Sequence, residues 1–207
     1  RFAPRYGFEA PALQDTLVAW ISHIVKTPLN AQGLCLAALP LAKRLNELEF
    51  DFAIDKVHIP ALNAVLDDYA GEPLQALGVE DLRGMITGVI DLVFEHDGRF
   101  YIADYKSNLL GNTLADYTPE RLRRAMLDRR YDLQYLLYIL ALHRYLQQRV
   151  PGYEYGRHMG GAVYLFLRAL RPAHGPACGV FHDLPPAEVI DRLNLLVLAA
   201  PSREILP

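Results

Sequence analysis

The feature that most constrains the fold is an Asp-Gly pair, Asp97-Gly98, between two apolar, β-rich runs. Such a pair is the strongest short-range signal of a β-hairpin, because a type I′ turn needs positive φ at both central residues. With these two residues as the loop, Asp91 on one strand faces Asp104 on the other. The stretch 85–108 is therefore predicted to fold as an antiparallel hairpin.

The facing pair of Asp91 and Asp104 needs an explanation. Cβ atoms of facing residues lie roughly 4.5–5.5 Å apart, and like charges placed there are destabilising. The neighbouring side chains are apolar, so the two carboxylates need a cation or a shared proton. Lys106 lies two residues beyond Asp104 and points to the same face. One hypothesis is a Mg²⁺ site, with Lys106 acting on water or phosphate; the other is a structural ion pair in which Lys106 bridges the two acids.

Asp91 followed by Asp104-Tyr105-Lys106 resembles the Asp…(Asp/Glu)-x-Lys pattern of the restriction-endonuclease-like, or PD-(D/E)XK, nucleases. The sequence is most similar to the RecB family of nuclease domains, found in the β subunit of exodeoxyribonuclease V. That resemblance is dense from about residue 83 to residue 168. The blocks that carry it are 88–94, 104–108, 131–135, 141–146 and 160–168.

The resemblance implies an α/β, restriction-endonuclease-like fold with a mixed central sheet flanked by helices. It also implies a hydrolase that cuts DNA phosphodiester bonds with Mg²⁺, or with Mn²⁺ as an alternative. Asp91 and Asp104 would hold the metal together with the backbone carbonyl of Tyr105, and Lys106 would orient the attacking water.

Gln134 and Tyr138 are the remaining candidate site residues. They are four residues apart on a predicted helix, so they share one face of it. They match a Gln-x-x-x-Tyr pair that lies beside the metal in the family. By themselves, they would favour a helix–sheet hydrogen bond with packing over a place beside a metal.

The rest of the chain supports an α/β fold, because strand and helix patterns are interleaved. Helices are expected at 12–26, 59–69, 119–130 and 131–149, and after Pro185-Pro186; strands are expected at 45–54 and 160–170, with an edge strand at 179–182. Residues 1–10 are expected to be an irregular lead-in, and 74–82 a connection with room for a helical turn. Glu49 belongs either to a solvated strand face or to the outer shell of the metal site.

The formal net charge of −3 gives no overall sign of nucleic-acid binding, so any DNA contact must use a local basic patch. The third predicted helix carries a cluster of arginines, which form either a solvated face or a DNA contact. These residues are Arg121, Arg123, Arg124, Arg129 and Arg130.

The length of 207 residues suits one domain, 1–207. The two cysteines, the lack of a signal peptide and the lack of a membrane-spanning apolar run favour a reducing cytosol. No Walker A motif occurs, so no nucleotide site is expected. The sequence begins with Arg1, so we expect it to be part of a longer protein. We also expect the first part of the domain to be missing from it. In the family, a metal-binding His lies in a Gly-containing motif on a helix well before the hairpin. That motif is not found in this sequence, and neither His23 nor His58 has its surrounding residues.

The resemblance implies a bacterial, cytoplasmic helicase–nuclease that acts in double-strand-break repair and recombination. Its expected partners are DNA, RecC-like and RecD-like subunits and RecA, with no membrane. Two alternatives stay open. The chain could be a non-catalytic docking module for RecA or the RecC-like subunit, or a related single-domain nuclease that works without a helicase.

Overall fold

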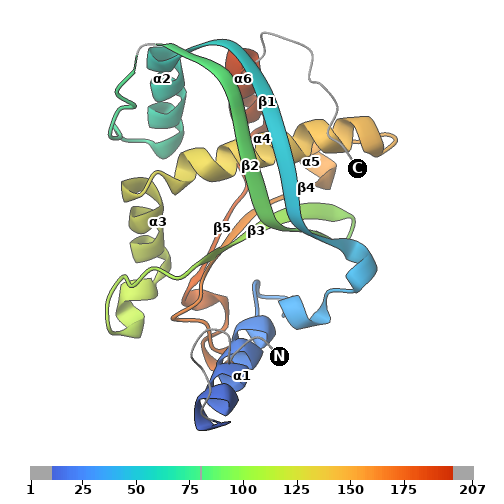
Figure 1. Ribbon diagram of the computed structural model, residues 1–207, viewed down its shortest axis with the longest axis vertical. Coiled ribbons are helices and arrows are strands. Elements are labelled where there is room, and N and C mark those ends of the chain that lie inside the picture. Colours follow the sequence, from blue (N-terminus) through green and yellow to red (C-terminus); the bar gives the residue numbers. More distant parts are fainter. Residues whose placement is uncertain (1–10, 80, 198–207) are drawn as a thin grey trace.

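The computed structural model describes residues 11–79 and 81–197, which form one α/β unit (Figure 1). None of the described helices is both long enough and apolar enough to cross a membrane. The helices are α1 (Pro11–Lys26), α2 (Ile59–Ala70), α3 (Pro119–Asp128), α4 (Tyr131–Arg149), α5 (Tyr155–His158) and α6 (Ala187–Val197). The strands are β1 (Arg44–His58), β2 (Asp81–His96), β3 (Arg99–Lys106), β4 (Met159–Phe166) and β5 (Val180–Asp183). Short 3-10 helices are η2 (Leu36–Ala38), η3 (Leu41–Lys43), η4 (Leu114–Tyr117) and η5 (Pro172–Ala177).

The five strands form one mixed sheet in the order β1-β2-β3-β4-β5. Only β3 and β4 are parallel, and the other neighbouring strands are antiparallel. Parallel neighbours need a long crossover, and here helices α3, α4 and α5 supply it. This arrangement confirms the predicted α/β class and its mixed central sheet.

The turn of the predicted hairpin has the expected geometry. Asp97 and Gly98 have φ angles of 50° and 74°, as a type I′ turn requires. Facing pairs between β2 and β3 run from His96–Arg99 to Leu92–Ala103. The hydrogen-bonded ladder therefore has the predicted register and ends one pair before Asp91 and Asp104.

β1 and β2 bend together where β2 leaves β3 (Figure 1). The residues on both sides of Glu47 in β1 pair with Ile90 and Leu92 of β2, so Glu47 lies opposite Asp91. Glu47 has a φ of 55°, which is uncommon for a residue other than glycine. Ile90 and Leu92 are buried in different core clusters, although strict alternation would place both on one face of the sheet. Asp91 thus lies at the point where the strand changes the face it presents.

The two core clusters lie on opposite faces of the sheet. The larger one joins the sheet to α2, α4 and α6, through residues such as Leu66, Ile139 and Leu193. The smaller one joins Phe94 and its neighbours to the end of α1 and the segment 29–39. The sheet is therefore covered mainly on one side, and α4 is the helix that crosses that side (Figure 1).

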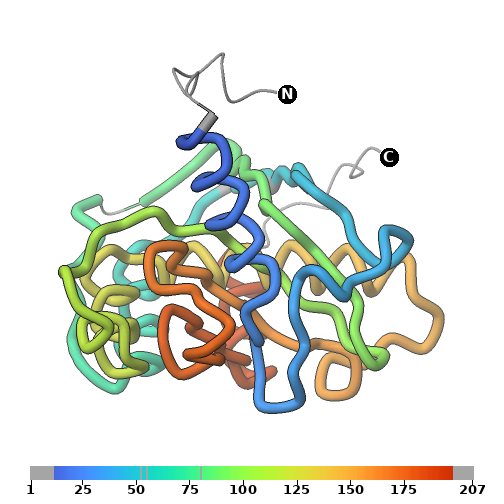
Figure 2. Tube along the Cα trace, turned by 90° about the horizontal axis from the view of Figure 1, so that it is seen from below, coloured from blue at the N-terminus to red at the C-terminus, as the bar shows by residue number. Residues whose placement is uncertain are grey.

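Helix α1 confirms the predicted helix, and only part of its apolar stripe is buried. Ile24 is buried near its end, whereas Leu13 and Ile21 are about half exposed, at 50% and 47%. Figure 2 shows the reason, because the first turns of α1 lead away from the body of the chain. Helical spacing specified the helix, but not how much of it the sheet could cover.

The largest differences from the predicted boundaries lie in the strands β1, β2 and β4. β1 runs on to His58, and β2 begins at Asp81, so part of the expected connection 74–82 is strand. This extension is a two-stranded ribbon with many exposed side chains, which weakens the apolar alternation that marks a strand. β4 ends at Phe166 rather than at residue 170, because the chain turns there and the Ala169 amide donates to the Phe166 carbonyl. The expected lead-in 1–10 lies outside the described residues.

Candidate active site

The two predicted acidic residues lie side by side at the bend of the sheet. The backbone N–H of Tyr105 donates to Oδ2 of Asp91 at 3.0 Å, which ties the end of β3 to the bend in β2. Asp104 is only 4% exposed, whereas Asp91 is half-buried. The hairpin therefore brings both carboxylates together and leaves Asp91 as the more accessible one.

Asp104 is electrostatically unfavourable where it lies. Burial raises the pKa of its carboxyl group above the usual range, and the negative charge of Asp91 raises that pKa further. Lys106 acts in the opposite direction through an ion pair of 2.7 Å with Oδ2 of Asp104. Since the pKa stays raised, the lysine does not fully offset the desolvation of the carboxylate.

Lys106 is held from several sides. Its ammonium group donates to Oε1 of Gln134 at 2.9 Å. It also lies 4.0 Å from the ring centroid of Tyr131 and 5.0 Å from that of Tyr164. Cations are attracted to aromatic faces at such distances. The ammonium group is therefore fixed by a carboxylate, an amide oxygen and two rings.

Gln134 bonds to this lysine, and Tyr138 lies on the same face of α4, as the four-residue spacing predicts. Nε2 of Gln134 donates to the Tyr138 hydroxyl at 3.0 Å. Burial raises the pKa of the Tyr138 phenol, so its hydroxyl keeps its proton. The structure thus brings together five of the predicted side chains, which are Asp91, Asp104, Lys106, Gln134 and Tyr138.

Tyr138 is positioned by β1 and by a glycine of β2. Its ring packs edge-on against Phe50, with centroids 5.6 Å apart. A Cβ atom at Gly88 would lie 2.5 Å from the Phe50 ring and 3.4 Å from the Tyr138 ring. Gly88 is therefore required for Phe50 to reach Tyr138 across the ribbon.

The donor set fits a hard divalent cation with few protein ligands. Two adjacent carboxylates suit Mg²⁺, which often takes one or two carboxylates and completes its shell with water and phosphate oxygens. Within residues 11–79 and 81–197, no group of three or more His, Cys, Asp or Glu side chains is placed to hold a metal. His23 is exposed on α1, and His58 pairs with Asp81 at 3.5 Å, so neither lies in a metal cluster. Glu49 is exposed and faces Val89.

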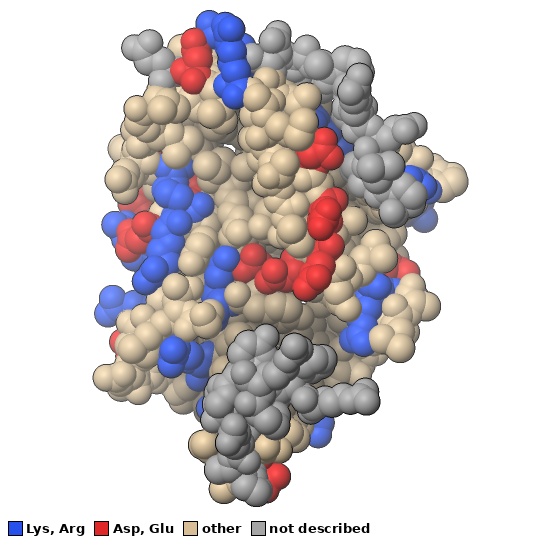
Figure 3. Space-filling model, in the orientation of Figure 1, with Lys and Arg blue, Asp and Glu red and all other residues tan. Residues whose placement is uncertain are grey.

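The predicted arginines do not form a single site. Three of them already have partners within the domain. Arg123 donates to the Ala70 carbonyl, Arg124 forms an ion pair with Asp128, and Arg130 forms one with Asp132. Arg121 and Arg129 line a polar pocket of about 560 Å³ between α3 and the loop that follows β3. In Figure 3, basic side chains gather over α3, beside an arc of acidic side chains over the bent strands.

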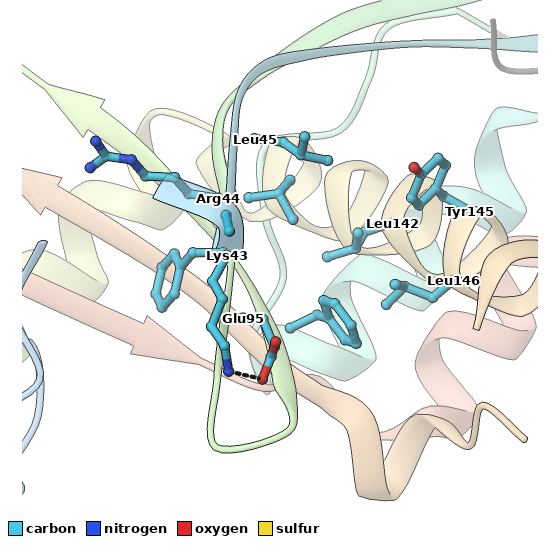
Figure 4. Close-up of a pocket in the computed structure, with 11 residues that line it drawn as sticks. Lys43, Arg44, Leu45, Glu95, Leu142, Tyr145 and Leu146 are labelled. Atoms are coloured by element: carbon cyan, nitrogen blue, oxygen red, sulfur yellow. Dashed lines mark hydrogen bonds and ion pairs between the residues drawn. The ribbon is translucent and has the colours of Figure 1, made fainter. Parts of the chain in front are cut away.

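A separate apolar cavity of about 230 Å³ lies near the turn of the hairpin, beside residues 93–95 of β2 (Figure 4). Its lining includes Phe100 of β3 and Leu142, Tyr145 and Leu146 of α4. The Lys43–Glu95 ion pair, 2.9 Å long, lies at its edge. None of the predicted site residues lines this cavity.

Two tyrosines that contact Lys106 were missed in the sequence. Tyr131 lies three residues before Gln134 on α4, so helical spacing could have placed it on the same face. Tyr164 comes from β4, where it pairs with Asp104 across the parallel ladder. No local sequence pattern predicts this pairing, because the helices α3, α4 and α5 lie between Asp104 and Tyr164 along the chain.

Comparisons with known proteins identify the family of this chain. A sequence model described as the PD-(D/E)XK nuclease superfamily matches residues 19–199. RecBCD enzyme subunit RecB of Haemophilus influenzae is 46% identical over 182 residues, which are 87% of this chain and 15% of that protein. The same subunit of Escherichia coli is 42% identical over 190 residues, which are 89% of this chain and 16% of that protein.

A more distant relative is RecB of Mycolicibacterium smegmatis, 37% identical over 212 residues, which cover 87% of this chain and 20% of that protein. The chain thus spans 15–20% of the length of these curated relatives. The match to the nuclease model, by contrast, covers most of the chain, including Asp91, Asp104 and Lys106. It confirms the family and enzyme class expected from the sequence. The chain belongs to the PD-(D/E)XK nuclease superfamily.

Proposed function

We propose that this domain hydrolyses DNA phosphodiester bonds with the help of Mg²⁺, or of Mn²⁺ in its place, bound by Asp91 and Asp104. The observation that carries the proposal is the buried carboxylate of Asp104. Burial and the charge of Asp91 raise its pKa although Lys106 lies 2.7 Å away. Apolar residues would serve stability as well as or better than such a group. Its presence therefore favours a chemical role.

The cation would be held by Asp91, Asp104 and the backbone carbonyl of Tyr105. When bound, it would polarise the scissile phosphate and lower the pKa of a coordinated water. The half-buried Asp91 lies on the accessible side of the pair, whereas Asp104 is 4% exposed. We therefore infer that the phosphate approaches from the side of Asp91.

Lys106 would serve the phosphate or the attacking water directly. An ammonium group has three hydrogens to donate. Asp104 and Gln134 accept two of them, at 2.7 Å and 2.9 Å. The third is left to orient the water or to offset negative charge on the phosphate. Gln134 and Tyr138 would steady the lysine from α4.

The polar pocket beside α3 would guide the DNA strand. Arg121 and Arg129 line it together with residues of the loop that follows Lys106 in sequence. Arginine side chains bind phosphate oxygens through paired donors. Arg123 and Arg130 would contribute less, because bonds within the domain already occupy them.

We further propose that the chain is the nuclease domain of a longer, bacterial RecBCD-type helicase–nuclease that acts in double-strand-break repair. The support is its similarity to proteins named RecBCD enzyme subunit RecB, which are much longer than this chain. RecC-like and RecD-like subunits would then be its partners. RecA would be a further partner, on the family resemblance alone.

The test is degradation of linear DNA by this chain with Mg²⁺, compared with Lys106→Ala and with Lys43→Ala as a matched control. Lys43 also forms an ion pair on the hairpin, with Glu95 at 2.9 Å, but it is exposed and lies away from the carboxylates. We expect cleavage by the wild type and by Lys43→Ala, and none by Lys106→Ala. Chelation with EDTA should stop cleavage.

Cleavage that survives in Lys106→Ala would overturn the assignment of the site. Absence of cleavage in the wild type, with folding confirmed by circular dichroism, would leave two readings, which are a docking module and a site that needs an upstream metal-binding histidine. Cleavage that appears when the upstream segment of the longer protein is added would decide for the second reading. Metal binding can be tested apart from DNA cleavage by titrating the protein with Mg²⁺ in a calorimeter. Asp91→Asn should weaken Mg²⁺ binding whether or not the chain cuts DNA.

A further inference from the structure

The position of Lys106 depends on the orientation of one amide group. The Gln134 side chain carries a carbonyl oxygen that accepts hydrogen bonds and an NH₂ group that donates them. The Lys106 ammonium group can only donate, so it requires the oxygen. Oε1 of Gln134 accepts from Lys106 at 2.9 Å. If the amide turned by 180°, two donors would face each other and the contact would be lost.

Tyr164 is a second donor that favours this orientation of the amide. Its hydroxyl donates to the same Oε1 of Gln134 at 3.0 Å. The other end of the amide donates to the Tyr138 hydroxyl at 3.0 Å. Tyr164 is fully buried at 0% exposure, and its ring packs on Tyr131 and Tyr135 with centroids 6.1 Å and 6.0 Å away. The hydroxyl therefore has a fixed position from which to hold the amide.

We infer that Tyr164 is a positioning residue for the reaction, whose hydroxyl fixes the Gln134 amide so that its carbonyl oxygen holds the Lys106 ammonium group. The inference rests on the proposed function, in which Lys106 acts on the phosphate or the water. Tyr164 comes from β4, directly beside Asp104 in the parallel ladder. The strand that carries Tyr164 thus supports the acid and the lysine of β3 at once.

The hydroxyl of Tyr164 must donate in this contact, because Oε1 of Gln134 can only accept. Burial, and to a lesser extent the negative charge of Asp104, raises the pKa of the Tyr164 phenol far above neutral pH. The group therefore keeps its proton wherever the protein is folded. A phenylalanine at this position would keep the ring contacts and remove only the hydrogen bond to Gln134.

The experiment compares Tyr164→Phe with Tyr135→Phe, a second buried tyrosine that packs on Tyr164. The Tyr135 hydroxyl donates to Asp183 at 2.7 Å rather than to Gln134, so we expect its loss to change stability and leave the Lys106 contact in place. Steady-state cleavage of linear DNA with Mg²⁺ gives kcat and KM for each variant. We expect Tyr164→Phe to lower kcat by about tenfold or more with little change in KM, as supporting residues of active sites often do. Tyr135→Phe should keep the wild-type kcat.

A double-mutant comparison tests whether Tyr164 acts through Gln134. Gln134→Leu alone should lower kcat at least as far as Tyr164→Phe does, and adding Tyr164→Phe to it should have no further effect. Additive losses would overturn the inference, as would an unchanged kcat in Tyr164→Phe. Thermal unfolding of all four proteins shows whether each variant is folded.

A structural readout keeps the inference separate from the proposed function. In a metal-free crystal structure of Tyr164→Phe, we expect the 2.9 Å contact between Lys106 and Gln134 to be lost. If the wild type does not cut DNA, the proposed function fails and this contact alone decides the inference. Retention of the contact in the variant would refute the positioning role in either case.

Discussion

Removing the charge of Lys106 should destabilise the domain, and the loss should grow as the pH rises. Lys106→Met keeps most of the aliphatic side chain and leaves the 4% exposed Asp104 without the ammonium group that lies 2.7 Å away. Breaking a buried ion pair by removing one partner costs about 3–5 kcal/mol. We expect a loss of about 3 kcal/mol, at the lower end, because Asp104 can bind a proton and so escape part of the penalty.

The pH dependence follows from the raised pKa of Asp104. Burial already raises that pKa in the wild type, and loss of Lys106 raises it further. Below the wild-type pKa, both folded proteins hold the proton, and the difference in stability is constant. Above the wild-type pKa, the folded variant still holds the Asp104 proton, whereas the folded wild type has lost it. The variant releases this proton when it unfolds. The difference should then widen by up to about 1.4 kcal/mol per pH unit, until the variant's own pKa is reached.

The assay is urea unfolding followed by circular dichroism in EDTA, between about pH 6 and pH 8. Lys43→Met is the control, because its ion pair with Glu95 has a similar length, 2.9 Å, and a side chain that is 47% exposed. Exposed pairs contribute about 0.2–1 kcal/mol. Equal losses in the two variants, or a Lys106→Met loss that does not widen with pH, would refute the reasoning.

Three further predictions follow from the same contacts. Asp104→Asn should abolish cleavage yet raise the melting temperature of the metal-free protein near neutral pH, since burial raises the pKa of Asp104 and its charged form opposes folding above the unfolded value of about 3.9. Gly98→Ala should lower the free energy of unfolding in urea by about 1 kcal/mol, because Gly98 has a φ of 74°. Arg121→Ala should weaken DNA binding and reduce its salt dependence by about one counterion, whereas Arg123→Ala, which loses a bond to the Ala70 carbonyl, should mainly lower stability.

The hairpin could be predicted from the sequence because the interactions that specify it are local. Asp97 and Gly98 have the backbone angles that an Asp-Gly turn requires. From that turn, alternation along the two strands brings Asp91, Asp104 and Lys106 to the same place. Gln134 and Tyr138 required the family resemblance, because nothing in helical spacing says which strand a helix will cover.

The rest of the site depends on contacts between distant parts of the chain. Tyr164 reaches Gln134 only because β4 pairs with β3 in parallel after a crossover of three helices. The arginines of α3 and of the turn that follows it illustrate the opposite error. Their clustering suggested one surface, but Arg123 and Arg130 are bonded within the domain. Charge in a sequence does not reveal which side chains the fold has already engaged.

The bend of the sheet explains why two like charges can lie together in this fold. At Asp91, the strand passes from one core cluster to the other, opposite the positive φ of Glu47. The ladder to β3 stops one pair earlier, so Asp91 is free to accept the Tyr105 amide and stays half-buried, while Asp104 remains inside. A straight ribbon would have paired the two residues directly and buried both carboxylates, with only Lys106 to offset them. The bend therefore opens one acid to solvent and keeps the other in a low-dielectric setting, an asymmetry that suits the proposed binding of a cation and a phosphate.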